Sequence, residues 1–137
     1  MYSLLDISGS GMTAHKEWME SISNNLANIN TTRTKDGSPY KRQSVVFEGK
    51  EKFDDVMNQE LGDGIQVSKV VQDNNTRLVY DPDHPAANKE GYVSYPDINM
   101  TSEMTDLLMA QRGYEANATV LSASKKVMEK EYDIGKV

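Results

Sequence analysis

Apolar side chains recur every three or four residues near the start of this chain. Positions 5, 8, 12, 15, 19, 22, 26 and 29 follow that step, and six of the eight are apolar: Leu5, Met12, Met19, Ile22, Leu26 and Ile29. Ser8 and His15 complete the set. A long, narrow stripe at this spacing is typical of a helix that pairs with another helix. The pattern predicts a helix that begins near Ser3 or Leu4 and ends after Asn30.

The same step runs from position 100 to position 132. Eight of these ten positions are apolar or aromatic, namely Met100, Met104, Leu107, Tyr114, Ala118, Leu121, Met128 and Tyr132, while Gln111 and Lys125 are polar. We expect Asn99 to be the N-cap of this second helix, because its side chain can accept a hydrogen bond from a first-turn N–H group. Gly113 falls in mid-helix, where we expect another backbone to approach closely.

Residues 34–98 change to the two-residue alternation of β-strands. We expect strands within 40–48, 65–69, 76–80 and 92–95 that form one small sheet, with a turn at 73–75 joining the second and third as a hairpin. Phe53, Val56, Met57 and Leu61 predict a short helical or looped stretch. The predicted fold class is therefore α+β, with long terminal helices paired as a coiled coil. The expected domains are a helix at 1–33, a β-rich insert at 34–98 and a helix at 99–137.

Composition narrows the function. The 137 residues carry a net charge of −6, and residues 34–98 alone hold 12 acidic and 8 basic side chains. An acidic chain without a basic cluster is a poor binder of phosphate backbones, so we expect no nucleic-acid partner. There is no cysteine for a disulfide or a thiolate site. No apolar run approaches the roughly 18 residues that span a bilayer, and no conventional signal peptide is visible.

Asparagine is concentrated at the end of the first predicted helix. Four of the seven residues from 24 to 30 are Asn, although Asn is a mediocre helix former. Two interpretations stay open here. The amides hydrogen-bond across packed helices, or the helix frays towards a loop.

Other polar groups suggest chemistry only weakly. Asp81, Asp83 and His84 could supply metal ligands, but the prolines beside them favour a rigid, solvated turn. Carboxylate pairs at positions 54–55 and 129/131 could suggest acid–base catalysis, yet no apolar run surrounds them to form a pocket. We therefore expect no metal, no cofactor, no small-molecule substrate and no catalytic residue.

Several short motifs stand at the two ends of the chain. The first end carries Asp6-Ile7-Ser8, Ser10-Gly11-Met12, Ala14, Asn24-Asn25-Leu26-Ala27-Asn28 and Thr31-Thr32. Together these motifs resemble the N-terminal signature of the flagellar rod and hook protein family. The segment before the last helix in the proximal rod and hook members is similar to residues 80–86, 91–93 and 95–99. Leu108, Ala110, Arg112 and residues 114–117 fit that last helix.

The resemblance implies a structural subunit of the proximal rod of the bacterial flagellar basal body, and not an enzyme. Copies of the chain and other rod proteins are the implied partners, with MS-ring and rod-adaptor proteins as further candidates at the rod base. Helical assembly through the terminal helices is implied to build a hollow drive shaft that crosses the periplasm and transmits torque. Export without a cleaved signal peptide, through the flagellar type III apparatus, is implied as well.

Two groups of residues form the expected interface. The packing group is Leu5, Met12, Met19, Ile22, Leu26, Ile29, Met104, Leu107, Tyr114, Leu121 and Met128. The polar group, expected to fix register, is Asn24, Asn25, Asn28, Arg112 and Asn117. Two helices alone leave little margin over the entropy of ordering them, so we expect neighbouring subunits to supply the remaining surface. Two alternatives are a soluble coiled-coil adaptor that forms a discrete oligomer and a small hydrolase that uses the acidic insert.

Overall fold

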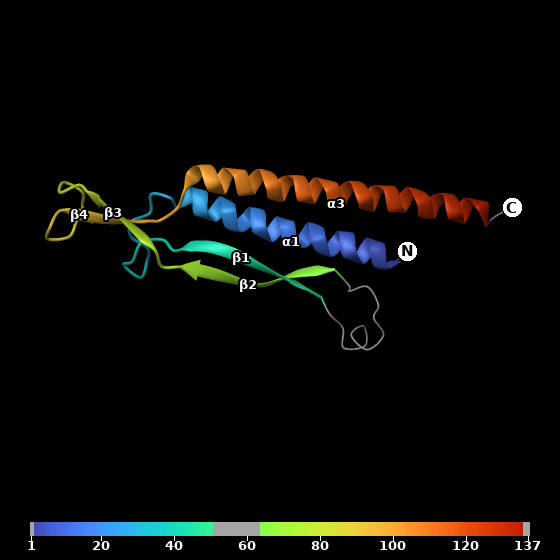
Figure 1. The fold of residues 1–137 in the computed structure, drawn as a ribbon, viewed down its shortest axis with the longest axis horizontal. Coiled ribbons are helices and arrows are strands. Elements are labelled where there is room, and N and C mark those ends of the chain that lie inside the picture. The colour runs from blue at the N-terminus through green and yellow to red at the C-terminus, as the bar shows by residue number, and fades with distance from the viewer. Residues whose placement is uncertain (1, 51–63, 136–137) are drawn as a thin grey trace.

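The computed structural model describes residues 2–50 and 64–135, and it contains two long helices and two small sheets (Figure 1). The elements are α1 (Tyr2–Ala27), β1 (Arg42–Gly49), β2 (Ile65–Asp73), β3 (Thr76–Tyr80), β4 (Tyr92–Pro96) and α3 (Met100–Ile134). The predicted α+β class, with a helix at each end of the chain, is confirmed. The stretch predicted around Phe53 and Leu61 lies outside the described residues.

Helix α1 is the central layer, with α3 along one side and the β1–β2 hairpin along another (Figure 1). It therefore buries a second face besides its apolar stripe: Ser10, Ala14, Ser21 and Asn25 are each no more than 9% exposed. The expectation of one narrow stripe was wrong for this helix. Hydrophobicity could not mark the second face, because its residues are small or polar and pair with the backbone of the hairpin.

Five of the ten positions predicted for the stripe on α3 are exposed, and the other five, Ala118 among them, are half-buried. Leu107, Tyr114, Leu121 and Met128 are half-buried as expected, but Met104 is 53% exposed, and Met100, Gln111, Lys125 and Tyr132 are exposed too. The buried positions are instead Glu103, Ala110 and Ser124. Small side chains occupy a seam where two helices approach closely, and a buried Glu needs polar partners, so apolarity did not reveal these positions.

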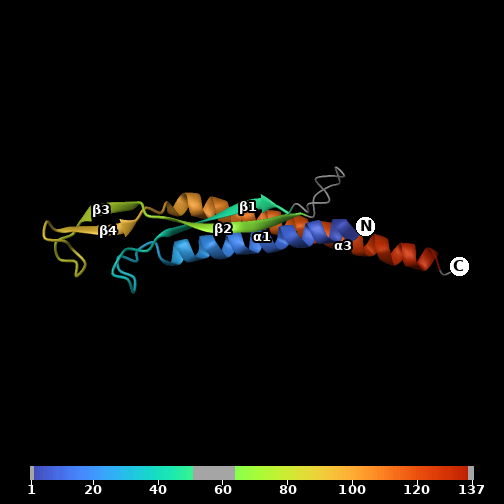
Figure 2. The same cartoon turned by 90° about the horizontal axis from the view of Figure 1, so that it is seen from below.

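The strand positions agree with expectation, but their pairing does not. Strand β1 pairs antiparallel with β2, and β3 with β4, so there are two separate two-stranded sheets and no β2–β3 hairpin. The Asn75 N–H donates to Asp73 Oδ1 at 3.0 Å, which makes a local Asx turn. After this turn β3 continues away from the helices in the direction of β2 instead of folding back (Figures 1 and 2).

The hairpin is fixed to α1 by one aromatic contact and several hydrogen bonds. Trp18 and Phe47 meet edge to face, with ring centroids 5.6 Å apart. Ser21 Oγ donates to the Gln43 carbonyl at 3.2 Å, and Ser10 Oγ accepts from the Ile65 N–H at 3.1 Å. Polar side chains of α1 thus hold β1 near one end of the hairpin and β2 near the other.

Three further predictions concern the N-cap of α3, the glycine in its middle and the asparagines at the end of α1. Asn99 is the N-cap of α3 and accepts from the Ser102 N–H at 3.1 Å, as predicted. At Gly113 it is the His15 ring that approaches, not a backbone. Both interpretations of the asparagine run hold in part: Asn25 hydrogen-bonds across to other elements, while Asn28 Nδ2 donates locally to the Asn24 carbonyl where α1 ends.

Candidate assembly interface

A buried polar cluster joins α1, β1 and α3 where the helix pair meets the strands. Glu103, in the first turn of α3, is only 1% exposed. One of its carboxylate oxygens accepts from Arg42 Nε at 2.6 Å, and the other accepts from Asn25 Nδ2 at 3.0 Å. The buried charge is therefore paired and hydrogen-bonded, as burial of a carboxylate requires.

Asn25 is the centre of this cluster and is fully buried. Its Nδ2 also donates to the Gln43 carbonyl at 2.8 Å, and its Oδ1 accepts from the Gln43 N–H at 2.8 Å and from the Tyr40 hydroxyl at 3.1 Å. Burial, and secondly the charge of Glu103, raise the pKa of Tyr40. We call Asn25, Tyr40, Arg42, Gln43 and Glu103 the base cluster. A fully connected polar network of this kind favours one arrangement of its elements over all others.

The opposite end of the helix pair is apolar and open. A groove of about 350 Å³ is lined by Leu4, Val120, Ala123, Ser124 and Val127, and we call it the end groove. Beyond it α3 continues past the start of α1 (Figure 2). Val127 is 50% exposed there and Ile134 is 75% exposed.

Large apolar side chains are exposed along much of the length of α3. Eight large hydrophobic residues of this helix are exposed: Met100, Met104, Leu108, Met109, Val120, Val127, Tyr132 and Ile134. Single exposed apolar residues are ordinary on a protein surface, but eight on one helix are not. The outer surface of α3, defined by these residues, is therefore a candidate for contact with another molecule.

The predicted packing residues lie mostly in the interior of the helix pair. Ile22 is 2% exposed, and the residues that are half-buried are Leu5, Met12, Met19, Leu26, Ile29, Leu107, Tyr114, Leu121 and Met128. Met104 lies apart from them on the outer surface of α3. Their expected role between subunits stays a prediction.

The predicted polar residues divide into two groups. Asn25 lies in the base cluster, and Asn117 lies against Gly11 of α1, so the structure brings both into the α1–α3 contact. Asn24 and Arg112 are exposed, and Asn28 serves the end of α1. The role predicted for these three residues, fixing the register between subunits, stays a prediction.

Sequence reasoning missed Glu103, Arg42 and Tyr40 as members of one site. They come from three places in the chain, and none stands in a motif of its own. One signal was available: Glu103 and Ala110 fall at the same step as Leu107 and Tyr114, so a seam could have been placed one residue earlier.

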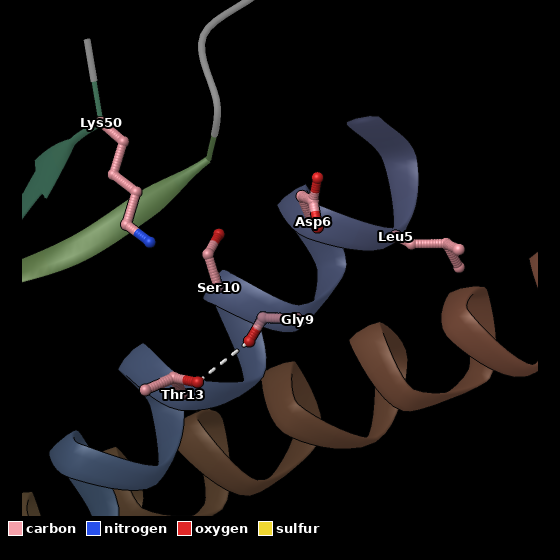
Figure 3. A pocket seen from close by; sticks show the side chains of 6 residues that line it. All are labelled: Leu5, Asp6, Gly9, Ser10, Thr13 and Lys50. Carbon is pink, nitrogen blue, oxygen red and sulfur yellow. Dashed lines mark hydrogen bonds between the residues drawn. The ribbon is translucent and has the colours of Figure 1, made fainter. Parts of the chain in front are cut away.

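A hollow lies near the start of α1 and is lined by Leu5, Asp6, Gly9, Ser10, Thr13 and Lys50 (Figure 3). Its volume is about 410 Å³. Both hydroxyls are committed to the fold: Ser10 Oγ donates to the Ile7 carbonyl at 2.8 Å, and Thr13 Oγ1 donates to the Gly9 carbonyl at 3.1 Å. The hollow therefore presents Asp6 and Lys50 as its charged groups.

Within residues 2–50 and 64–135, no group of three His, Cys, Asp or Glu side chains is placed to hold a metal ion. His84, weighed above as a ligand, accepts from the Ala86 N–H at 3.0 Å through Nδ1. In the same described part of the chain, no helix combines the length and the apolarity needed to cross a membrane.

Comparison with known proteins places these features in a family. The model of the flagella basal body rod protein matches residues 5–35, and the model of the flagellar basal body rod FlgEFG protein C-terminal region matches residues 89–132. These are the two helical ends, with part of the segment before α3.

Three relatives that the chain matches over nearly their whole length have the same name. The chain is 40% identical to the flagellar basal-body rod protein FlgC of Bacillus subtilis, with 96% of each chain covered. It is 36% identical to FlgC of Borreliella burgdorferi, covering 93% of this chain and 92% of that one. It is 33% identical to FlgC of Salmonella typhimurium, with 98% of each covered. This chain belongs to the FlgC family of flagellar basal-body rod proteins.

Proposed function

We propose that this chain is a structural subunit of the proximal rod of the bacterial flagellar basal body, and that it assembles through its terminal helices. The relatives that cover almost its whole length are named as basal-body rod proteins. The observation that carries the assembly mechanism is the outer surface of α3, which exposes eight large apolar residues along one helix. In a rod, these residues are buried against helices of neighbouring subunits.

The middle of α3 is suited to close contact with another helix. Residues 116–124 contain no charged side chain, and Ala116, Thr119, Val120 and Ala123 are exposed within that stretch. Exposed helix faces normally carry charges, whereas small uncharged side chains allow a second helix to approach. This part of α3 therefore has the composition of a helix–helix interface and not of a solvated face.

The end groove adds an unequal contact to this surface. It joins Leu4 of α1 to Val120, Ala123 and Val127 of α3 at one end of the molecule only. Contacts between different patches on two copies repeat with a rotation and a rise, and they generate an open helical tube. Such a tube of interlocked helices resists twisting and therefore transmits torque. Other rod proteins, and at the rod base the MS-ring and rod-adaptor proteins, are the partners we propose.

The location that we propose is the periplasm-spanning rod, reached through the flagellar type III apparatus without a cleaved signal peptide. This rests on the family alone. The role that we propose is structural, in line with the names of these relatives.

The test places a charge at two apolar positions inside the helix pair and at one on the outer surface of α3. Leu121→Asp and Leu26→Asp place a charge at half-buried positions, and Leu108→Asp places one at a residue that is 58% exposed. Expressed in a strain lacking the native gene, all three should abolish motility and be absent from purified basal bodies. Leu108→Asp should still yield a folded chain by circular dichroism.

Normal motility in the Leu26→Asp and Leu121→Asp strains would overturn the proposal. Light scattering and electron microscopy of the purified chain distinguish the adaptor alternative. A fixed small stoichiometry favours an adaptor, whereas rings or tubes favour the rod.

A further inference from the structure

We propose that two glycine notches, one on each helix, hold α1 and α3 in a single longitudinal register. Each notch receives a larger side chain from the opposite helix: His15 of α1 enters at Gly113, and Asn117 of α3 enters at Gly11. This positioning role does not depend on the proposed function, because it concerns contacts within one chain. It sets how far α3 extends past α1.

The first notch leaves no room for a methyl group. A Cβ built on Gly113 would lie 2.5 Å from both Cε1 and Nε2 of His15. The ring has little room to move away, because Trp18 and Phe47 both neighbour it, with centroids 6.1 and 6.3 Å distant. Its Nδ1 is buried with no hydrogen-bond partner among the described residues. This nitrogen therefore does not hold the ring in place, and the position of the ring depends on packing.

The second notch is the mirror arrangement. A Cβ on Gly11 would lie 2.7 Å from Nδ2 and 3.1 Å from Cγ of Asn117. Gly11 is itself buried, and Asn117 is half-buried. Gly9, two residues earlier on the same helix, offers the contrast, because a Cβ there meets no described atom within 4 Å. Tight fit is thus a property of these two glycines and not of every glycine in the helices.

Three close pairs between the helices share one offset. In the pairs His15–Gly113, Gly11–Asn117 and Asn25–Glu103 the two residue numbers total 128. Leu4 and Ser124, which line the end groove together, fit the same total. The notches and the base cluster therefore specify the same register from separate points along the pair.

A slide of four residues, about 6 Å along the axis, destroys every one of these pairings. In one direction His15 would face Asn117, and Asn25 would face Leu107. In the other direction His15 would face Met109, and Glu103 would lose Asn25 for Ser21. Either slide puts two large side chains together and leaves a buried polar group without its partner.

The register also fixes a length that an assembly can use. It places Tyr2 opposite Lys126, so about eight residues of α3, 127–134, extend beyond α1 for roughly 12 Å. A slide of four residues would lengthen or shorten this extension by half. The notch residues thereby position Val127 and Ile134 without touching them.

The first experiment measures the thermal unfolding midpoint of the full chain in three variants. Gly113→Ala should lower it by roughly 3 to 10 °C, because the methyl group collides with the His15 ring. Gly9→Ala, the matched control, should raise it by roughly 2 to 4 °C through helix propensity alone. In a His15→Ala background, Gly113→Ala should become neutral or stabilising, since the ring is gone.

The second experiment measures register directly. The chain has no cysteine, so Glu20→Cys and Ser122→Cys, both at exposed positions, can carry the only two spin labels. With Gly11→Ala and Gly113→Ala together, the inter-label distance should shift by about 6 Å or split into two populations. Adding His15→Ala and Asn117→Ala should restore the original single distance, which also covers the case in which the clashing variant fails to fold.

Two results would overturn the proposal. One is an equal effect of Gly113→Ala and Gly9→Ala on the unfolding midpoint. The other is an inter-label distance that stays unchanged when both notches are filled. Neither result touches the assembly role, which the motility and basal-body measurements test separately.

Discussion

The two ends of the helix pair are built from opposite kinds of side chain. At the base cluster, Glu103 and Asn25 are buried and hydrogen-bond to polar groups, from the Arg42 side chain to the backbone of Gln43. At the end groove, Val120 and Val127 are apolar and exposed. The base cluster therefore uses its buried groups for hydrogen bonds within one chain. The end groove instead leaves apolar side chains exposed.

This difference separates the part of the molecule that fixes the subunit's fold from the part that is suited to contact between subunits. Buried polar groups are a weak source of net stability, but they penalise any arrangement that leaves them unpaired. Exposed apolar surface contributes little to a single chain and becomes favourable once it is covered. The base cluster is thus suited to defining the subunit, and the end groove to joining subunits.

The largest expected effect on the free energy of unfolding comes from disrupting the base cluster. Glu103→Ala removes the acceptor of Arg42 Nε and Asn25 Nδ2 and leaves the Asn25 amide one bond short in a buried site. The free energy of unfolding should fall by about 2 to 4 kcal/mol, at the lower part of the range for buried pairs because the Arg42 side chain is 30% exposed. Denaturant titration of the purified chain measures it.

Glu115→Ala is the control for that variant. Glu115 is exposed and takes part only in a same-helix contact, accepting from Gln111 Nε2 at 3.0 Å. Its removal should change the free energy of unfolding by less than about 0.5 kcal/mol. Equal effects of the two variants would mean that the base cluster has no special weight.

A second prediction concerns the open end and separates assembly from stability. Val127→Asp puts a charge in the end groove at a residue that is 50% exposed, so the free energy of unfolding should stay within about 0.5 kcal/mol. Incorporation into basal bodies should fall about tenfold, which corresponds to losing the burial of one apolar side chain. Competition between tagged native and variant chains, quantified by mass spectrometry of purified basal bodies, gives the ratio.

Asn74→Asp provides the matched change of charge, from neutral to negative, at an exposed residue outside both helices and away from the lining of the end groove. If the two variants enter basal bodies equally well, the end groove faces solvent in the rod, and the contrast between the two ends loses its functional meaning.

The same contrast explains what the sequence could and could not predict. Local patterns were sufficient for the α+β class, for Asn99 as N-cap and for the apolar positions Leu107 and Leu121, because each depends on neighbours in the chain. The pairing of β1 with β2 was missed, since strand register is decided by partners far apart in sequence and by an Asx turn that looked like a hairpin turn.

The base cluster could not be predicted from the sequence for a related reason. Taken singly, Arg42, Tyr40 and Glu103 read as surface residues, and only the meeting of three elements makes them buried partners. Gly113 was predicted to be a point of close approach, but the sequence did not indicate that side chains, His15 and Asn117, lie opposite Gly113 and Gly11. Apolar periodicity identifies which residues leave water, but polar and small residues at a seam are defined by what faces them.

The smallest expected effect probes the edge of the base cluster. Tyr40→Phe removes one donor to Asn25 Oδ1, which keeps its bond from the Gln43 N–H, so the free energy of unfolding at neutral pH should fall by about 1 kcal/mol. Because the pKa of Tyr40 is raised in the folded chain, the neutral phenol is favoured by folding. That contribution is fully present below the pKa of tyrosine in the unfolded chain, and it is lost as pH rises through the folded value. The stability gap between the native chain and Tyr40→Phe should therefore narrow in alkaline solution, as paired denaturant titrations at neutral and alkaline pH can measure. A gap that widens with pH would mean that the ionised phenolate is the form the base cluster stabilises, which the neighbouring charge of Glu103 forbids.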